Sequence, residues 1–465
     1  MADRHDDVDA WLSERIDPLP PPPGTFELIK RRARRRKFRK LAITATSAAA
    51  IVAAAVTVPQ VVRLPVLSPG PQSSVAAGTG QQSSSATPTR TGSNGETSSA
   101  AGSAVPIPAP VPPDFQPSSV TFVGQGTGWV IGQAGTPGHC ATQYCTSVAR
   151  TDDAGSTWAG VPAPLAGPPD GATGVGQVRF LNTHDGWAFG PGLFVTHTGG
   201  RTWTPVDTRG LRVTDLETVG RRVFALWASC TGSGPAYGSQ CASFTLYSAP
   251  AAGGSWAPVG AATTGLSGGT GDGAAGQAAA LVLTGSRGYL LAPGGALYAG
   301  PVDGSAPWQR IGSLVSSCTV GPARANGQPA GALLGAVNAN DLIVACMSAS
   351  GTAGQRKQVF SSPNGGVSWL RMGTAPTAGT AFSLAASPSG SVLLATDQGI
   401  DLLPRGEIAW RTATLKGDAP AGGFGFVGMT TDDQGIALPA DPSAGTVWFT
   451  FDGGRDWQPS RLDGP

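Results

Sequence analysis

The sequence predicts an all-β protein whose residues 115–465 form a seven-bladed β-propeller of four-stranded antiparallel blades. Three observations predict it. The chain of 465 residues contains 68 glycines and 40 prolines, which interrupt helices, and only 13% charged residues, against about 25% in an average soluble protein. A segment ending in tryptophan recurs seven times. Alternating apolar stretches and turns precede each of these tryptophans, which is typical of consecutive β-strands.

The tryptophan repeat sets the size of one structural unit. Four copies are closely similar: 151–158 (TDDAGSTW), 196–203 (THTGGRTW), 362–369 (SPNGGVSW) and 450–457 (TFDGGRDW). Looser copies end at Trp256, Trp308 and Trp410. The spacing of roughly 50 residues is the length of a propeller blade.

The second repeat shows most clearly how a unit is built. Residues 176–208 contain GQVRFLN, DGWAFG, GLFVTHT and TWTPVDT, four short apolar segments separated by turns. Such a series predicts an antiparallel meander, which is the repeating unit of a propeller. In each unit the tryptophan is expected to open the fourth strand.

The motif Ser/Thr-x-Asp-x-Gly-x-Ser/Thr-Trp closely resembles the Asp-box, or bacterial neuraminidase repeat. The resemblance places it on the turn between the third and fourth strands. There an Asp or Asn accepts backbone N–H bonds, a glycine adopts φ > 0 and the tryptophan packs between units. Thr198, Asn364 and Asp456 depart from the consensus. The matching residues are Thr151, Asp153, Gly155, Thr157, Trp158, Gly200, Trp203, Asn364, Gly366, Trp369, Asp452, Gly454 and Trp457.

Asp-boxes imply a fold and leave the activity open, because sialidases, sortilin-type receptors, xyloglucanases and photosystem II assembly factors all contain them. The pattern here looks most like the photosystem-assembly type of propeller. A sialidase-like hydrolase is the alternative, but beyond the predicted membrane span only Glu96, Glu217 and Glu407 are available as glutamates. No tyrosine remains for the usual nucleophile, so we expect no catalytic residues. Arg179 is a candidate for the central channel, although a solvated strand-edge arginine is the simpler interpretation.

The N-terminal region predicts a membrane anchor. Residues 30–40 carry nine cations in eleven positions, and residues 41–62 contain no charge. A helix of about 20 residues crosses the ~30 Å hydrocarbon layer. The positive-inside rule then places residues 1–40 in the cytoplasm and the C-terminal domain outside, at the cell surface. The alternatives are a cleaved export signal resembling a twin-arginine motif and a nucleic-acid patch, which we do not expect.

Residues 63–114 form the predicted linker between span and propeller. They consist mainly of Ser, Thr, Pro, Gly, Ala and Gln and lack aromatic residues before the propeller. Such a composition buries too little apolar surface to offset the entropy of ordering, so disorder is expected. Its Ser, Thr and Pro content resembles a cell-surface stalk.

All six cysteines lie beyond the linker, which predicts disulfide bonds in an oxidising compartment. Sequence proximity favours the pairs Cys140–Cys145, Cys230–Cys241 and Cys318–Cys346 among the fifteen possible connectivities. A zinc site is the alternative, but no histidine pair accompanies the cysteines at a suitable spacing. We therefore expect no metal and no cofactor.

These observations predict a single-pass membrane protein with an extracytoplasmic propeller that serves as a binding or scaffold module. We expect its partner to be a protein or a glycan. The sequence alone identifies neither the ligand, nor the oligomeric state, nor a signalling role of the cytoplasmic segment.

Overall fold

Each tryptophan repeat folds as one four-stranded antiparallel meander, and the described residues form seven sheets built in this way. The computed structural model describes residues 109–136, 139, 142–168, 171–231, 240–267, 279–292, 295–314, 331–349 and 355–462. All of them belong to one unit, Ser99–Pro465. The predicted segments 1–40 and 41–62, and the linker up to residue 108, lie outside the described residues. Within the described ranges, no helix is both long enough and apolar enough to span a membrane.

Blades I to IV follow one another along the chain, with these strand bounds. Blade I contains β1 (Gln116–Val123), β2 (Thr127–Gln133), β3 (Thr146–Thr151) and β4 (Ala159–Val161). Blade II contains β5 (Gln177–Phe180), β6 (Gly186–Phe189), β7 (Leu193–Thr196) and β8 (Thr204–Pro205). Blade III contains β9 (Arg212–Val219), β10 (Arg222–Thr231), β11 (Gln240–Pro250), β12 (Ala257–Pro258) and β13 (Leu266–Ser267). Blade IV contains β14 (Ala280–Leu283), β15 (Arg287–Leu291), β16 (Ala296–Pro301) and β17 (Gln309–Ser313).

Blades V to VII complete the ring. Blade V contains β18 (Ala332–Ala336), β19 (Leu342–Ala349), β20 (Gln355–Ser362) and β21 (Leu370–Ala375). Blade VI contains β22 (Ala381–Ala386), β23 (Val392–Thr396), β24 (Gly399–Leu403) and β25 (Arg411–Thr412). Blade VII contains β27 (Phe424–Met429), β28 (Gly435–Pro439), β29 (Thr446–Thr450), β30 (Asp456–Arg461) and the added β26 (Thr414–Leu415). Two 3-10 helices, η1 (Ala261–Thr263) and η2 (Pro442–Ala444), lie in connections.

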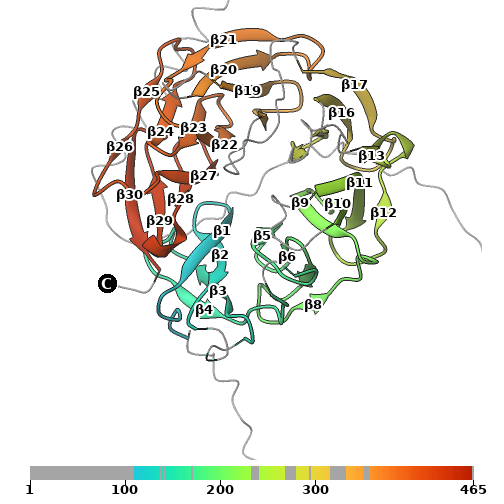
Figure 1. The fold of residues 1–465 in the computed structure, drawn as a ribbon, viewed down its shortest axis with the longest axis vertical. Helices are drawn as coiled ribbons and strands as arrows, with labels where there is room; N and C mark the ends of the chain where they lie inside the picture. Colours follow the sequence, from blue (N-terminus) through green and yellow to red (C-terminus); the bar gives the residue numbers. More distant parts are fainter. Residues whose placement is uncertain are drawn as a thin grey trace, which may run out of the picture. The chain divides into compact units, whose positions relative to one another are not determined.

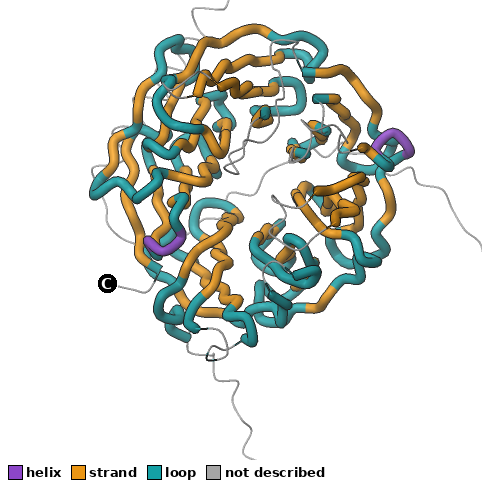
Figure 2. The backbone as a smooth tube through the Cα atoms, in the orientation of Figure 1, coloured by secondary structure: helices purple, strands orange, loops and turns teal. Residues whose placement is uncertain are grey.

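The predicted all-β seven-bladed propeller is therefore confirmed for the described residues. Figure 1 shows strands β1, β5, β9, β22 and β27 near the centre of the ring and strands such as β8, β12, β21 and β30 at its periphery. Figure 2 shows strands and loops making up nearly all of it. Two sheets gain a fifth strand: β13 pairs with β11, and β26 runs parallel to β30. The second addition covers the outer edge of a blade, which would otherwise present unpaired backbone groups.

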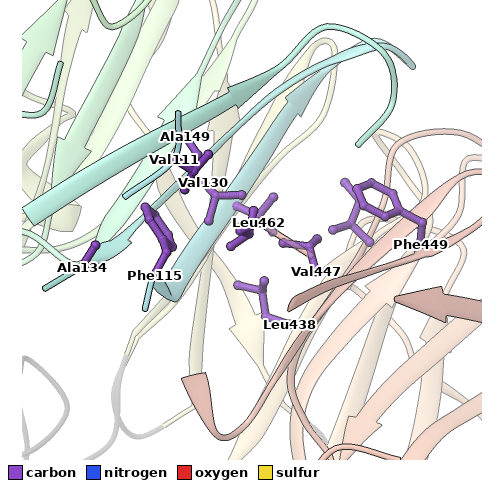
Figure 3. Packing of buried hydrophobic residues seen from close by; sticks show 11 residues of the cluster. Val111, Phe115, Val130, Ala134, Ala149, Leu438, Val447, Phe449 and Leu462 are labelled. Atoms are coloured by element: carbon purple, nitrogen blue, oxygen red, sulfur yellow. The ribbon is translucent and has the colours of Figure 1, made fainter. Parts of the chain in front are cut away.

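The core of the propeller lies between blades. The described residues form seven apolar clusters, each shared by two adjacent blades. Figure 3 shows the cluster that closes the ring, in which Val130 of blade I lies near Leu438 and Val447 of blade VII. Because flat sheets cannot bury both faces alone, each blade depends on its neighbours for stability.

Candidate functional site

The seven repeat tryptophans lie at one equivalent place in every blade. The outer strand begins immediately after Trp in six blades, and in blade VII it includes Trp457. Each of the seven clusters contains one of these tryptophans. They are Trp158, Trp203, Trp256, Trp308, Trp369, Trp410 and Trp457. A tryptophan thus packs at every junction between blades.

The four closest copies of the motif share one hydrogen-bonding pattern on the turn between third and fourth strands. In blade I, the Asp153 carboxylate accepts from the Thr151 hydroxyl at 2.8 Å, the Thr157 backbone N–H at 2.9 Å and the Thr157 hydroxyl at 2.7 Å. The Thr151 hydroxyl in turn accepts from the N–H of Gly155 at 3.0 Å. The result is a closed polar turn on the exposed rim of the blade.

The other three turns keep this pattern despite their substitutions. The amide oxygen of Asn364 accepts from the Ser368 N–H at 2.9 Å, and Asp452 Oδ1 accepts from the Asp456 N–H at 3.1 Å. In blade II the hydroxyl of Thr198 accepts from the Thr202 N–H at 2.9 Å. A hydroxyl oxygen therefore replaces the carboxylate in blade II, and an amide oxygen replaces it in blade V.

The glycines of these turns are required by both conformation and space. Gly155, Gly366 and Gly454 have φ of +84°, +91° and +90°. A Cβ on Gly155 would lie 2.3 Å from the ring of Phe449, which belongs to the neighbouring blade VII. The equivalent Gly200 has φ of +91°. Since L side chains rarely adopt this φ, the conformation of the turn requires a glycine at this position.

Four of the six cysteines lie among the described residues, and all four are disulfide-bonded. Cys230 and Cys241 form a disulfide between β10 and β11, as predicted. Cys145 and Cys346 are also disulfide-bonded, whereas Cys140 and Cys318 lie outside the described residues. The pairs Cys140–Cys145 and Cys318–Cys346 therefore stay predictions, which peptide mapping without reduction would test. In the part of the chain that is described, no group of three His, Cys, Asp or Glu side chains is placed to hold a metal.

The inner strands bring a different set of residues to the centre. Side chains of these strands accept hydrogen bonds from the backbone of the neighbouring blade. The Thr121 hydroxyl in blade I accepts from the N–H of Phe180 in blade II at 3.4 Å. Asp215 Oδ2 accepts from the N–H of Leu281 at 2.9 Å. A side chain of one inner strand thus accepts a hydrogen bond from a backbone N–H of the next inner strand. The acceptor is the Thr121 hydroxyl in blade I and the Asp215 carboxyl group in blade III.

A cavity of about 480 Å³ lies where the inner strands β1, β5, β9 and β27 end. Apolar residues are the largest group in its lining, and they include the six side chains Val120, Phe122, Phe180, Val219, Phe426 and Met429. Thr121, Thr218 and Thr430 are its neutral polar side chains, and Arg179 and Glu217 its charged ones. Four different blades build the cavity, so it depends on a closed ring.

Arg179 and Glu217 form an ion pair on the wall of this cavity. Arg179 Nη2 donates to Glu217 Oε1 at 2.8 Å, and Arg179 Nε donates to the backbone carbonyl of Leu216 at 3.4 Å. The side chains retain 22% and 28% of their exposure, so both remain accessible from the cavity. The structure thus places Arg179, a candidate for the central channel from the sequence, on the wall of this cavity at the end of an inner strand.

Asp215 lies two residues before Glu217 on β9. It was not predicted as a site residue from the sequence. Burial, with the nearby negative charge of Glu217, raises the pKa of Asp215 to about 7. Burial also raises the pKa of Glu217, against the opposing charge and hydrogen bond of Arg179. The alternation in RVTDLETV would have indicated two acidic side chains on one face of a strand. Asp215 is not among the residues that line the cavity.

Comparisons with known proteins extend only to solved structures. No protein-family model and no curated protein matches the chain. YCF48 from Cyanidioschyzon merolae is similar at 14% identity and a TM-score of 0.42, over 62% of this chain and 85% of that one. A structure described as YCF48 bound to a D1 peptide is similar at 17% identity and a TM-score of 0.39, over 64% of this chain and 86% of that one. An ancestral GH74 enzyme is similar at 13% identity and a TM-score of 0.31, over 72% of this chain and 56% of that one. Similarities this distant leave the function open.

Proposed function

We propose that the chain is a membrane-anchored, extracytoplasmic binding protein whose propeller recognises a protein partner at the central cavity. The observation that carries this proposal is the composition of the cavity wall. Aromatic and aliphatic side chains surround a single ion pair, Arg179–Glu217. Concave sites with apolar walls and a few placed polar groups are the usual form of a binding pocket.

The same wall favours a protein over a glycan. Sugars are recognised through many hydrogen bonds, whereas the neutral polar side chains here are three threonines. The three phenylalanines Phe122, Phe180 and Phe426 and Met429 instead provide surface for an apolar side chain of the partner. Methionine suits such a surface because its unbranched side chain adapts to different shapes.

Binding is also better supported than hydrolysis. A glycoside hydrolase normally uses two carboxyl groups that flank the scissile bond. Among the described residues that line the cavity, Glu217 is the single carboxylate, and it is paired with Arg179. His, Cys, Lys, Ser and Tyr are absent from this described lining as well. The wall therefore offers a means of recognition and lacks an acid–base pair.

The turns on the rim of the blades have a structural role in this proposal. We propose that the four turns of blades I, II, V and VII are Asp-boxes. Their Asp, Asn or Thr side chains form hydrogen bonds within the turn, as Asp153 does. Because each of these side chains holds the backbone of its own turn, we assign the turns to stability and the cavity to binding.

The membrane anchor is the part of the proposal that rests on sequence. The cation run at residues 30–40 and the uncharged stretch 41–62 support a cytoplasmic N-terminus and an external propeller. Protease treatment of intact cells should digest the propeller and leave residues 1–40 protected. Protection of both ends would overturn the anchor.

Site-specific photo-crosslinking in intact cells tests the binding role. A photoreactive amino acid is placed at Thr218, which lines the cavity, and as a control at Leu165, which is 83% exposed between blades I and II. We expect one discrete protein adduct from position 218 that is absent from position 165. Adducts of equal yield and identity at both positions would contradict recognition at the cavity.

A further inference from the structure

Exposed apolar side chains are concentrated in one part of the propeller. Among the described residues, five large apolar side chains are exposed, and four of them belong to blades V to VII. These four lie on, or directly after, the turn between the third and fourth strands: Val367 and Leu370 in blade V, Ile408 in blade VI and Phe451 in blade VII. We call this set the apolar rim. A single exposed apolar residue is common on protein surfaces, but here the same turn carries one in three consecutive blades.

Two of these side chains occupy an equivalent position of the repeat. Val367 and Ile408 each lie two residues before the tryptophan of their blade, and they are 73% and 88% exposed. The same position holds Ser156 in blade I, Arg201 in blade II and Arg455 in blade VII. Since polar residues serve the turn in those blades, the fold does not require an apolar residue at this position. The exposed apolar surface is therefore available for a contact outside the chain.

The apolar rim lies on one face of the ring. Alternate strands of an antiparallel sheet run in opposite directions, so the turn between strands three and four lies at the same end of a blade as the turn between strands one and two. Backbone N–H groups of the outer turn donate to oxygens of the inner turn in all three blades: Gly365 to Asn340 at 2.6 Å, Arg405 to Ser391 at 3.2 Å and Gly453 to Asp433 at 2.9 Å. Figure 1 shows β21, β25 and β30 following one another along the periphery. Leu165, the fifth exposed apolar residue, lies in a connection between blades and hence at the opposite face.

Cations lie beside the apolar side chains. Four exposed arginines are each within four residues of one of them: Arg371, Arg405, Arg411 and Arg455. The acidic side chains of the same turns are engaged nearby: Glu407 with Arg411, Asp456 with Lys416 and Asp452 within its own turn. Other carboxylates of these blades, Asp341, Asp432 and Asp433, lie on the inner turns. Apolar side chains flanked by cations suit the interface of a bilayer with anionic lipids, and this combination is found on the rim.

The predicted linker brings this rim within reach of a bilayer. Residues 63–108 have an r.m.s. length of about 35–40 Å as a flexible chain, so the proposed anchor keeps the propeller close to the membrane. The described chain begins at Ala109, whose carbonyl accepts from the N–H of Gly160 on β4, the outer strand of blade I. Blade I adjoins blade VII. The linker therefore joins the propeller beside the blade that carries Phe451.

Separate projecting side chains suit a lipid surface better than a protein surface. Val367, Ile408 and Phe451 lie on three different turns, whose other residues are mostly polar or small. A stable protein interface needs about 800 Å² of matched surface on each partner. Lipids rearrange around single side chains, so a bilayer requires no matched shape.

We propose that the apolar rim of blades V to VII rests on the outer surface of the membrane, with Val367, Ile408 and Phe451 inserted between lipids and the neighbouring arginines beside anionic headgroups. This inference rests on the proposed membrane anchor and specifies which side of the propeller meets the bilayer. The wall of the central cavity comes mostly from blades I to III, so the two proposed sites use different parts of the ring.

Site-specific photo-crosslinking to lipid tests the contact. The full-length chain carries p-benzoylphenylalanine at position 367, 408 or 451 in intact cells whose lipids contain a radioactive fatty acid. Position 165, equally apolar in the unaltered chain, is the control for the opposite face, and position 156 is the equivalent position in blade I. We expect lipid adducts at 367, 408 and 451 to exceed those at 165 and 156 by at least about five-fold, because insertion places the probe against acyl chains.

Each other outcome would overturn part of the inference. Equal yield at 165 would overturn the choice of face, and equal yield at 156 would overturn the assignment to blades V to VII. Protein adducts in place of lipid adducts at 367, 408 and 451 would assign the rim to a protein partner. The same probe at Ile51, inside the predicted span, tests the anchor separately. Lipid adducts at 51 with none at the rim would overturn the rim contact alone, whereas no lipid adduct at 51 would count against the anchor.

A charge variant tests the role of the arginines. The full-length chain with the probe at position 408 is reconstituted into vesicles of phosphatidylcholine and phosphatidylglycerol. Arg405→Gln should lower the yield of lipid adduct by about two- to five-fold, the effect of one cation near an anionic surface. Arg201→Gln is the matched control, because Arg201 is exposed on the equivalent turn of blade II, and it should leave the yield unchanged. Equal yields for the two variants would overturn the contribution of the rim cations.

Discussion

The indole N–H of Trp158, in the first blade, donates to the hydroxyl oxygen of Ser460, in the last blade, at 3.1 Å. The Ser460 hydroxyl in turn donates to the backbone carbonyl of Gly155. Residues more than 300 positions apart are thereby joined. The ring closes through side chains and the shared apolar cluster, since β27–β30 of blade VII all come from the C-terminal end of the chain.

Removing this hydroxyl should weaken ring closure. Ser460→Ala leaves the Gly155 carbonyl and the Trp158 N–H without their partner, so we expect the free energy of unfolding to fall by about 1–3 kcal/mol. Urea unfolding followed by tryptophan fluorescence measures it. Ser443→Ala is the control, because that exposed serine hydrogen-bonds to Asp441, two residues away, and does not join two blades. Equal midpoints for both variants would show that closure does not depend on Ser460.

The rim turns should act as independent structural elements. Asp153→Ala removes the acceptor for Thr151 and Thr157, and we expect a loss of about 0.5–1.5 kcal/mol in the free energy of unfolding. Asp452→Ala should cost a similar amount, and the double variant should be additive because the sites belong to different hydrogen-bond networks.

Asp152→Ala is the matched control for the turn. Its carboxylate is 62% exposed and pairs only with Arg150, so its loss should cost less than 1 kcal/mol by the usual size of surface pairs, roughly 0–1 kcal/mol. A larger effect at Asp152 than at Asp153 would refute the assignment of the turn.

Stability should depend on pH through Asp215. Its pKa rises from 3.8 to about 7 in the folded chain, chiefly because of burial. Between these values the folded state retains a proton that the unfolded state releases, so this contribution to stability declines as pH rises from about 4 to 7. Asp215→Asn keeps an oxygen for Leu281 and removes the proton, so the decline should become shallower.

Urea midpoints at pH 4.5 and 8 measure this dependence. Glu217 and Asp401 contribute with the same sign, since the pKa of each is raised, so part of the decline should persist in the variant. The exposed Asp418, changed to Asn, is the control. A pH profile of Asp215→Asn that is identical to that of the unaltered chain would contradict the role of this carboxyl group.

A buried lysine should stabilise the connection between blades V and VI. Lys357 is fully buried and donates through Nζ to the carbonyls of Ala378 at 2.6 Å and Gly379 at 2.9 Å. Lys357→Met leaves these carbonyls and the buried Asp401 without their cation, which should cost about 3–5 kcal/mol. Lys416→Met, at an exposed rim pair, is the control. Thermal unfolding compares them, and equal melting temperatures would contradict this role.

The sequence allowed the fold to be predicted because local patterns repeat. The segment TDDAGSTW contains the whole turn that Asp153 and Gly155 form, and the strands of blade II were readable from apolar alternation alone. The cavity was not predictable in this way. Arg179 and Glu217 meet only because strands 38 positions apart lie in neighbouring blades, and no local pattern states which inner-strand residues share a wall. The same holds for Lys357, whose partners lie in a connection between blades.

The most direct test of binding at the cavity compares two variants in one titration. The protein recovered by crosslinking from position 218 is titrated calorimetrically into the full-length chain carrying Thr218→Trp or Asp153→Ala. A tryptophan at position 218 would fill part of the cavity of about 480 Å³. We expect Thr218→Trp to weaken binding at least ten-fold at an unchanged melting temperature, and Asp153→Ala to lower the melting temperature and leave the affinity unchanged. Undiminished affinity in Thr218→Trp, with binding lost in the folded Asp153→Ala chain, would contradict it.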